Sequence, residues 1–325
     1  MKPHILALCG GVGGAKMALG LARLLGEDEL TIAVNTGDDF EHLGLSISPD
    51  IDTVAYTLSG LADRTQGWGI EGDTRIFLTA LARLGGETWF QLGDQDLAMH
   101  MERTRRLAAG ETLSQITRAL TLRLGIGHLV APMSDQPVRT WLDTDEGPLE
   151  FQPYFVRDRC RPLARAIRYE GSAAARPSPA LAAALAGTDL AAILICPSNP
   201  YLSIDPILAI PGVAEAIRAS SAPCVAVSPI VGGAAIKGPT AKLMRELGVT
   251  PGVRAIAEHY QGLIDGLVLD EADTADAGAI EAMGVRTLVT ATIMRSEADR
   301  VALAGDALAF ATSLAGPPRA QRRAG

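Results

Sequence analysis

The sequence predicts an α/β fold with a doubly wound, mostly parallel sheet, and three observations favour it. Short apolar runs alternate along the chain with longer segments that have helical apolar spacing. Glycine-rich or acidic turns follow many of the apolar runs, at the strand end where ligands bind in folds of this class. Hydrophobic residues make up 48% of the 325 residues, which is enough for a large buried core. We therefore expect a Rossmann-like architecture.

The predicted strands are short and almost entirely apolar, as strands covered on both faces are. The first is Ile-Leu-Ala-Leu-Cys at 5–9, and the second is Leu-Thr-Ile-Ala-Val at 30–34. The remaining predicted strands are 88–92, 128–131, 190–196, 224–227, 267–269 and 287–290.

The predicted helices lie between these strands, as the crossovers of a parallel sheet require. Several begin near an acidic residue or a proline, or end at a glycine, and these are common signals at helix termini. The predicted helices are 17–25, 53–61, 74–84, 97–108, 113–124, 179–186, 240–247, 254–260 and 297–314.

The strand–helix alternation is interrupted between 136 and 178. Residues alternate in polarity on both sides of the turn Asp-Thr-Asp-Glu-Gly-Pro at 143–148, which predicts an antiparallel hairpin. We therefore expect a single α/β domain formed by 1–135 and 179–315, with 136–178 as an inserted subdomain. The tail 316–325 is basic and polar, and we expect it to be disordered.

Charge and composition exclude several classes of protein. The net charge of -8 and the pI near 5.2 argue against a nucleic-acid partner or an anionic membrane surface. The four cysteines show no metal-ligand spacing, as expected for buried thiols in a reducing compartment. The apolar run before the first glycines is too short for a signal peptide, and no run approaches the ~20 apolar residues of a membrane helix. We expect a cytoplasmic protein.

Four glycines follow the first predicted strand and precede a helix: Gly10, Gly11, Gly13 and Gly14. Free backbone N–H groups and the positive end of a helix dipole at such a turn suit a phosphate. The turn matches neither the dinucleotide fingerprint nor a Walker A loop, because Lys16 and its neighbours stand where those motifs need other residues. The alternative is a tight strand-to-helix turn with close packing.

Four carboxylates follow the second predicted strand: Asp38, Asp39, Asp50 and Asp52. Oxygen ligands of this kind suit Mg²⁺ that is also bound by substrate phosphates. Helix capping by Asp50 or Asp52 is the alternative.

Two more groups of polar residues are candidates for ligand binding. Asp94 and Asp96, with His100 following, could position a hydroxyl nucleophile or a ligand, or could cap a helix. Lys237 and Lys242 lie on either side of a Gly-Pro pair and could neutralise phosphate charge, or could be surface lysines.

A set of strand-end motifs resembles one family. In order they are N-T-G-D-D followed by S-P-D-I-D-T-V, W-G-I-E-G-D-T, L-G-D-Q-D-L-A-M-H, P-M-S-D-Q-P-V, P-S-N-P with S-I-D-P-I-L, and A-V-S-P-I-V-G-G-A-A-I-K-G-P-T-A-K-L-M. Together they resemble the 2-phospho-L-lactate transferases, which make the deazaflavin coenzyme F-420. The resemblance runs from Ile5 to Met294.

The resemblance implies a reaction and its partners. The donor would be a guanosine diphosphate whose terminal phosphate is esterified to lactate, enolpyruvate or glycerate, and the residues do not separate these acids. The acceptor would be the deazaflavin FO, whose terminal ribityl hydroxyl attacks the acid-bearing phosphorus and displaces GMP. Mg²⁺ would offset the charge of the pyrophosphate. We also expect a homodimer.

The resemblance further implies roles for individual residues. Asp50 and Asp52 become metal ligands and acceptor-site candidates, and one of them could orient or deprotonate the attacking hydroxyl. The glycine loop, defined here as Gly10 to Gly14, becomes the cradle of the diphosphate. The other ligand-binding candidates are Asn35, Thr36, Asp94, Asp96, His100, Ser134, Asp135, Ser198, Asn199, Ser228, Gly232, Gly233 and Lys237. The last four of these would meet the guanosine phosphates.

The sequence departs from the family pattern at two positions of the acceptor-side motif. Gln95 stands where we expect a basic residue, and Met99 stands where a threonine is usual. Aromatic residues are only 4% of the chain, and Trp68 and Trp89 are the nearest candidates for stacking the deazaflavin.

Two other functions remain to be weighed. The gluconeogenesis-factor-like proteins, which are nucleotide-sugar-binding regulators, share the fold and the glycine loop. A sequence of that kind should lack the Asp50/Asp52 pair and the intact L-G-D-Q-D, and both are present here. A Rossmann oxidoreductase is disfavoured because Asn35, and not an acidic residue, ends the second strand.

Overall fold

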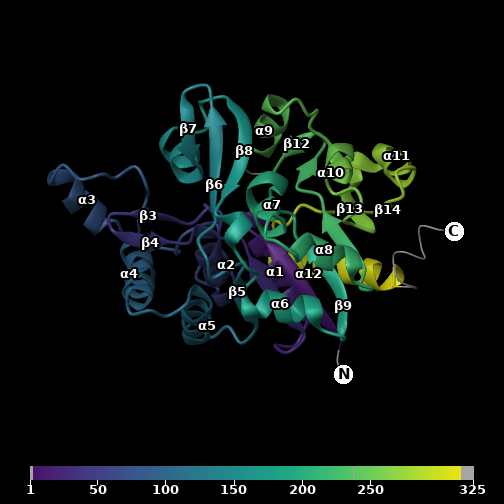
Figure 1. The fold of residues 1–325 in the computed structure, drawn as a ribbon, viewed down its shortest axis with the longest axis horizontal. Coiled ribbons are helices and arrows are strands. Elements are labelled where there is room, and N and C mark those ends of the chain that lie inside the picture. The colour runs from purple at the N-terminus through teal and green to yellow at the C-terminus, as the bar shows by residue number, and fades with distance from the viewer. Residues whose placement is uncertain (1–2, 237, 316–325) are drawn as a thin grey trace.

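A seven-stranded sheet forms the centre of the protein, and the computed structural model describes residues 3–236 and 238–315. All strand pairs in this sheet are parallel, and their order is β14-β13-β10-β9-β1-β2-β5 (Figure 1). In that order the strands are Arg286–Thr290, Gly266–Asp270, Cys224–Val227, Leu190–Ile195, His4–Cys9, Leu30–Val34 and Leu129–Pro132. The predicted α/β class is confirmed.

The chain builds the sheet outwards from β1 in two directions. It first adds β2 and β5 on one side, and then returns to add β9, β10, β13 and β14 on the other. The order therefore reverses between β1 and β9, whose pairing places Leu8 opposite Ile195. Ligands bind outside the carboxyl ends of the strands at such a point. Gly10 follows β1 there, and Pro197 follows β9.

Alternate residues of β1 pack into two different hydrophobic layers, as the two-residue period of a strand requires. Leu6 and Leu8 pack in the layer that contains α6 (Pro179–Ala186), α8 (Val213–Ala219) and α10 (Val253–His259). Ala7 and Cys9 pack in the layer that contains α1 (Gly11–Leu24), α2 (Pro49–Ser59) and α12 (Glu297–Ser313). These two layers bury both faces of the sheet.

A separate antiparallel sheet stands beside this core (Figure 1). Its strands are β6 (Arg139–Thr144), β7 (Gly147–Glu150) and β8 (Ala164–Glu170), in the order β7-β6-β8. The hairpin predicted around 143–148 is therefore confirmed, while β8 was not predicted. The division into one α/β domain and an inserted subdomain stays a prediction.

One predicted strand is wrong. Residues 88–92 are irregular, because Trp89 and Phe90 pack against Phe40, with ring centroids 5.9 and 4.8 Å away. Phe40 belongs to a small hairpin, β3 (Phe40–His42) and β4 (Leu45–Ile47), where no strand was predicted. The L-G-D-Q-D motif therefore does not end a strand of the sheet.

Most helix boundaries lie within a few residues of the prediction, and two of the differences affect the site. Helix α1 begins at Gly11, so most of the glycine loop is helical. Helix α2 begins at Pro49, so Asp50 and Asp52 lie in its first turn and not before it. The remaining α-helices and strands are α3 (Ile76–Arg83), α4 (Asp94–Ala108), α5 (Leu113–Arg123), α7 (Asp205–Leu208), β11 (Ile230–Val231), β12 (Ala234–Ala235), α9 (Thr240–Glu246) and α11 (Ala277–Glu281).

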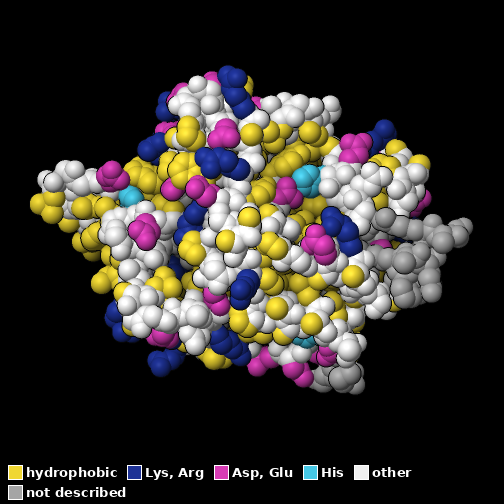
Figure 2. All heavy atoms as spheres, in the orientation of Figure 1, with side chains coloured by type: hydrophobic (Ala, Val, Ile, Leu, Met, Phe, Trp, Pro, Cys, Tyr) yellow, Lys and Arg dark blue, Asp and Glu magenta, His cyan; other side chains and the backbone are white. Residues whose placement is uncertain are grey.

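Helix α3 projects from the body of the protein (Figure 1). Its residue Ile76 is 72% exposed, and Leu84, which follows the helix, is 85% exposed. Hydrophobic atoms are accordingly visible on the surface at the left edge of Figure 2. No helix in the described part of the chain is both long and apolar enough to span a membrane. The predicted disordered tail, 316–325, lies outside the described residues.

Candidate functional site

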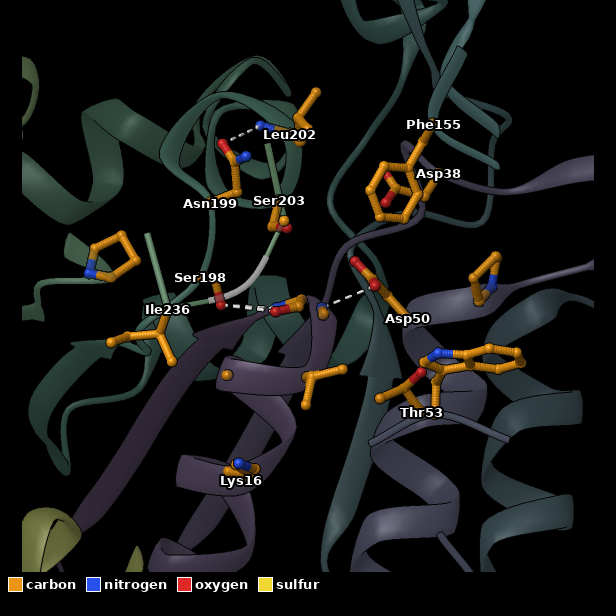
Figure 3. A pocket seen from close by; sticks show the side chains of 18 of the residues that line it. Lys16, Asp38, Asp50, Thr53, Phe155, Ser198, Asn199, Leu202, Ser203 and Ile236 are labelled. Carbon is orange, nitrogen blue, oxygen red and sulfur yellow. Dashed lines mark hydrogen bonds between the residues drawn. The ribbon is translucent and has the colours of Figure 1, made fainter. Parts of the chain in front are cut away.

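A cavity of about 920 Å³ opens at the carboxyl ends of the central strands (Figure 3). Its size is in the range that holds a large small-molecule ligand. Ten of the predicted site residues line it: Gly10, Gly11, Gly13, Asp50, Asp52, Asp96, His100, Ser198, Asn199 and Ser228. Residues distant in the sequence therefore meet at one site.

The glycine loop is packed against the loop that follows β9. The Gly10 N–H donates to Ser198 Oγ at 3.1 Å, and Ser198 Oγ donates to the Gly10 carbonyl at 2.8 Å. A Cβ on Gly14 would lie 2.6 Å from Ser198 Oγ, and one on Gly13 would overlap the Pro197 carbonyl. Close packing thus requires glycine at these positions, while Gly11 leads into the N-terminus of α1 at the cavity wall.

Asp50 connects the first turn of α2 to the glycine loop. Its Oδ1 accepts the Gly11 N–H at 2.8 Å, and its Oδ2 accepts the side-chain amide of Asn35 at 2.9 Å (Figure 3 shows the first bond). Burial raises the pKa of Asp50 to about 6, although both hydrogen bonds act to lower it. The carboxylate is therefore held by neutral donors in a buried position.

Asp38 shares the same amide group. The Asn35 side chain also donates to Asp38 Oδ1, at 3.1 Å, so that one amide bridges the two carboxylates. Burial, followed by the charge of Asp50, raises the pKa of Asp38 well above its usual value. Both carboxylates line the cavity, and two buried acids this close attract a cation.

Asp52 belongs to a different polar network. Arg103 on α4 donates to Asp52 Oδ1, and His100 Nδ1 lies 3.5 Å from Asp52 Oδ2. His100 Nε2 in turn lies 3.2 Å from Asp96 Oδ2, and the Tyr56 hydroxyl donates to Asp96 Oδ1 at 2.6 Å. The side chains of Asp52, Asp96 and His100 could together hold a metal ion. Asp52 already has a cationic partner in Arg103, however, whereas Asp50 is hydrogen-bonded to Gly11 and Asn35.

The different partners of Asp50 and Asp52 follow from helix geometry. Two residues apart on a helix, their side chains point about 200° away from each other. Asp50 faces the glycine loop, while Asp52 faces α4.

Comparisons with known proteins decide the family. The model of the family described as "2-phospho-L-lactate transferase CofD" matches residues 5–298. The chain belongs to this family. It is 41% identical over 315 residues to a phosphoenolpyruvate transferase of Kitasatospora aureofaciens, covering 95% of this chain and 98% of that one. It is 39% identical over 292 residues to a 2-phospho-L-lactate transferase of Methanosarcina mazei, covering 90% and 95%.

A solved structure supports the fold. A UPF0052 family protein from Bacillus halodurans superposes with a TM-score of 0.58 at 16% identity, covering 90% of this chain and 93% of that one. At this identity the likeness concerns the fold alone. The family prediction from the sequence motifs is confirmed by the family model and the two transferase relatives.

Several candidates suggested by the transferase motifs lie outside the cavity lining: Gly14, Asn35, Thr36, Asp94, Ser134, Asp135, Gly232 and Gly233. Asn35 is fully buried, and it acts on the site by holding Asp38 and Asp50. Asp94 accepts the backbone N–H groups of Ile76 and Phe77 at the start of α3, at 2.9 and 3.0 Å, so it caps a helix.

Two more of the outlying candidates, Asp135 and Gly232, also have structural partners. Asp135 accepts the Ser114 N–H at the start of α5, at 2.7 Å. The Gly232 N–H, which could have met a phosphate, donates to both oxygens of Asp273 at 3.1 and 3.0 Å. Lys237 lies outside the described residues.

Sequence reasoning missed parts of the transferase cavity wall. Phe90, Phe151 and Phe155 line it together with the expected Trp68, whereas Trp89 does not. Phe151 and Phe155 stack with ring centroids 5.2 Å apart and come from the segment between β7 and β8. Both lie in the segment predicted as an inserted subdomain, and no motif there indicated a ligand, so the sequence held no signal that would place them at the site.

Proposed function

We propose that the protein transfers a phospho-organic-acid group from a guanosine-diphosphate-linked donor to the terminal ribityl hydroxyl of FO. The transfer releases GMP and belongs to the biosynthesis of coenzyme F-420. Membership of the transferase family supports this activity. The observation that carries it is the contact between the glycine loop and Asp50 at one wall of a large cavity. It brings a phosphate-binding helix terminus beside a buried acid, as a metal–diphosphate site requires.

Asp38 and Asp50 would hold the Mg²⁺ of this reaction. Their hydrogen-bond donors described above, the Gly11 N–H and the Asn35 amide, are neutral, and both acids offer hard oxygen ligands. When bound, the ion would offset the negative charge of the pyrophosphate. Asp52, which is paired with Arg103, is the weaker candidate of the two acids in the P-D-I-D motif.

The aromatic wall would bind the deazaflavin ring of FO. Trp68 and Phe155 are 42% and 38% exposed and line the cavity, so their faces are available for stacking. Asp96, hydrogen-bonded to Tyr56, also lines the cavity and could accept a hydrogen bond from a hydroxyl of the acceptor.

The transfer is a displacement at phosphorus. The hydroxyl oxygen of FO forms a bond to the acid-bearing phosphorus, the bond from that phosphorus to the GMP oxygen breaks, and the hydroxyl proton leaves. Asp50 and Asp52 are the candidates for orienting the hydroxyl and accepting the proton. Asp50 is the better candidate for orienting the hydroxyl, because its donors Gly11 and Asn35 are neutral, whereas Asp52 is paired with Arg103. Positioning and electrostatic stabilisation would supply most of the rate enhancement.

The product assay tests this proposal. Purified protein is incubated with FO, Mg²⁺ and one donor at a time: guanylylated phospholactate, guanylylated phosphoenolpyruvate or guanylylated phosphoglycerate. The mass of the deazaflavin product is then measured by mass spectrometry. We expect a phosphodiester of FO with at least one donor. One relative is named a phosphoenolpyruvate transferase, at 41% identity, and another a 2-phospho-L-lactate transferase, at 39%. These names do not identify the acid that this chain transfers, so the assay has to identify it. No product with any donor, together with tight binding of a nucleotide sugar, would favour the gluconeogenesis-factor-like alternative.

A further inference from the structure

The cavity has ends of opposite charge. Its acidic end carries Asp38, Asp50, Asp52 and Asp96. Among the described lining residues, the lysine and arginine side chains are those of Lys16 and Arg295. In Figure 3, Lys16 lies on α1 well away from Asp38 and Asp50.

Lys16 and Arg295 are brought together by one backbone contact. Lys16 Nζ donates to the Met294 carbonyl at 3.0 Å, directly before Arg295 in the chain. Lys16 follows Gly11 by about 8 Å along the helix axis. Lys16 and Arg295 both line the cavity, so this contact places two cationic residues on one part of its wall.

The segment that carries Arg295 is held at both ends. Asp270 Oδ2 accepts the N–H and the hydroxyl of Thr292, both at 2.9 Å. Asp299 Oδ2 accepts the N–H groups of Arg295 and Ser296, at 2.8 and 2.7 Å. Residues 292–295 therefore form a fixed wall of the cavity between the end of β14 and the start of α12.

We propose that Lys16 and Arg295 bind the carboxylate of the acid carried by the donor. This inference rests on the proposed function, in which the donor carries a diphosphate and a carboxylate. The glycine loop would bind the diphosphate, together with the Mg²⁺ that Asp38 and Asp50 would hold. The carboxylate is repelled by the remaining acids and attracted by the cations of the opposite end. Lys16 and Arg295 are then residues that determine specificity for acid-bearing donors.

A binding experiment without turnover tests the inference. The affinities of two ligands are compared by calorimetry: guanylylated phospholactate, and the ethyl ester of guanosine diphosphate, which keeps both phosphates but lacks the carboxylate. We expect the wild-type protein to prefer the carboxylate ligand by about tenfold or more, the value of a charge-assisted hydrogen bond. Lys16→Met and Arg295→Gln should each remove most of that preference and leave the affinity for the ethyl ester nearly unchanged.

Two further variants serve as controls. Arg295→Lys keeps the charge and should keep most of the preference. Arg218→Gln removes an arginine with a half-exposed side chain on α8, outside the cavity, and should change neither affinity. Equal weakening of both ligands by Lys16→Met and Arg295→Gln would overturn the inference, because the cations would then bind phosphate.

The inference and the proposed function fail in different ways. A wild-type protein that prefers the carboxylate ligand but makes no product with FO contradicts the transferase activity and supports the carboxylate site. A protein that makes product but binds both ligands equally contradicts the carboxylate site alone.

Discussion

The backbone N–H of Gly11 donates a hydrogen bond of 2.8 Å to Asp50 Oδ1, and this bond joins the two halves of the candidate site. Gly11 begins the helix whose N-terminus suits a phosphate, and Asp50 lies in the first turn of α2. A phosphate and the Asp50 carboxylate would repel each other if both accepted a hydrogen bond from that N–H. A bound cation would remove the conflict, because it would attract both anions.

Replacement of Asp50 should separate activity from folding. We expect Asp50→Asn to lower the rate of transfer to FO on the order of a hundredfold or more while the protein stays folded. The measurement is the rate of product formation by mass spectrometry, with circular dichroism for folding. Asp143→Asn changes a half-exposed acid on β6 outside the cavity; it is the matched control and should keep its activity. Near-normal turnover of Asp50→Asn would remove this residue from the site.

The same acid should make stability depend on pH. The pKa of Asp50 is raised from 3.8 to about 6, so the folded protein binds this proton more tightly than the unfolded chain does. Its contribution to the free energy of unfolding is therefore fully present below about pH 4 and is lost as the pH rises through about 6. We expect metal-free Asp50→Asn to be more stable than the wild type at pH 7, by on the order of 1–3 kcal/mol. Urea unfolding across this pH range checks the sign.

Magnesium should stabilise the wild-type protein through Asp38 and Asp50. We expect added Mg²⁺ to raise the thermal midpoint of the wild type, and chelation to reverse the effect. Asp38→Asn and Asp50→Asn should each remove most of the shift. A full shift in both of these variants, with its loss in Asp96→Asn, would place the ion at Asp52, Asp96 and His100 instead.

Arg103 should be needed for folding stability. It is buried and paired with the buried Asp52, so Arg103→Met leaves an uncompensated charge. We expect a loss of about 3–5 kcal/mol in the free energy of unfolding. Arg105→Met, two residues along α4, removes a side chain that is 67% exposed, and we expect a loss below about 1 kcal/mol. Similar losses in the two variants, measured by denaturant unfolding, would contradict the role of the buried pair.

Gly14 should tolerate no side chain. A Cβ there would lie 2.6 Å from Ser198 Oγ and 2.9 Å from Cys9 Cβ. Gly14→Ala should therefore displace the loop after β9, cost about 1–3 kcal/mol of stability and weaken GDP binding. Gly278 on α11 has open space around its Cβ position, and Gly278→Ala should be neutral or stabilise the protein by up to about 1 kcal/mol. Calorimetric titration with GDP and thermal unfolding of both variants make the comparison.

The aromatic wall should affect the acceptor and not the nucleotide. We expect Trp68→Ala and Phe155→Ala to raise the KM for FO by about tenfold each, through lost stacking, with GDP affinity unchanged. Phe77→Ala changes an aromatic residue of α3 that does not line the cavity, and it should leave the KM for FO unchanged. A rise in the GDP dissociation constant with no change in the KM for FO would assign Trp68 and Phe155 to the nucleotide and not to the acceptor.

The sheet could be predicted because its strands carry strong local signals. The strands 30–34 and 224–227 were predicted to the residue, since each is a buried apolar run beside a turn or a polar residue. The error at 88–92 has a different origin. Its apolar residues, Trp89 and Phe90, pack against the aromatic hairpin β3–β4, and a sequence does not show whether such a run pairs in a sheet or packs beside one.

The site could be predicted in part. The glycine loop and Asp50 meet because both follow strands that end at the same edge of the sheet, which is a rule of the fold class. The pairing of Asp52 with Arg103 spans 51 residues and depends on how α4 packs, so no spacing rule reveals it. No spacing rule places residues 292–295 at the cavity either. They follow β14, which lies at one edge of the sheet, and still line the cavity.

The most direct test of the proposed reaction follows the oxygen of the acceptor. FO labelled with a heavy oxygen isotope in its terminal ribityl hydroxyl is incubated with the protein, Mg²⁺ and the donor that gives product. Attack of that hydroxyl on the acid-bearing phosphorus predicts that the label stays in the phosphodiester and that unlabelled GMP is released in equal amount. Loss of the label from the product, or release of GDP in place of GMP, would contradict the account.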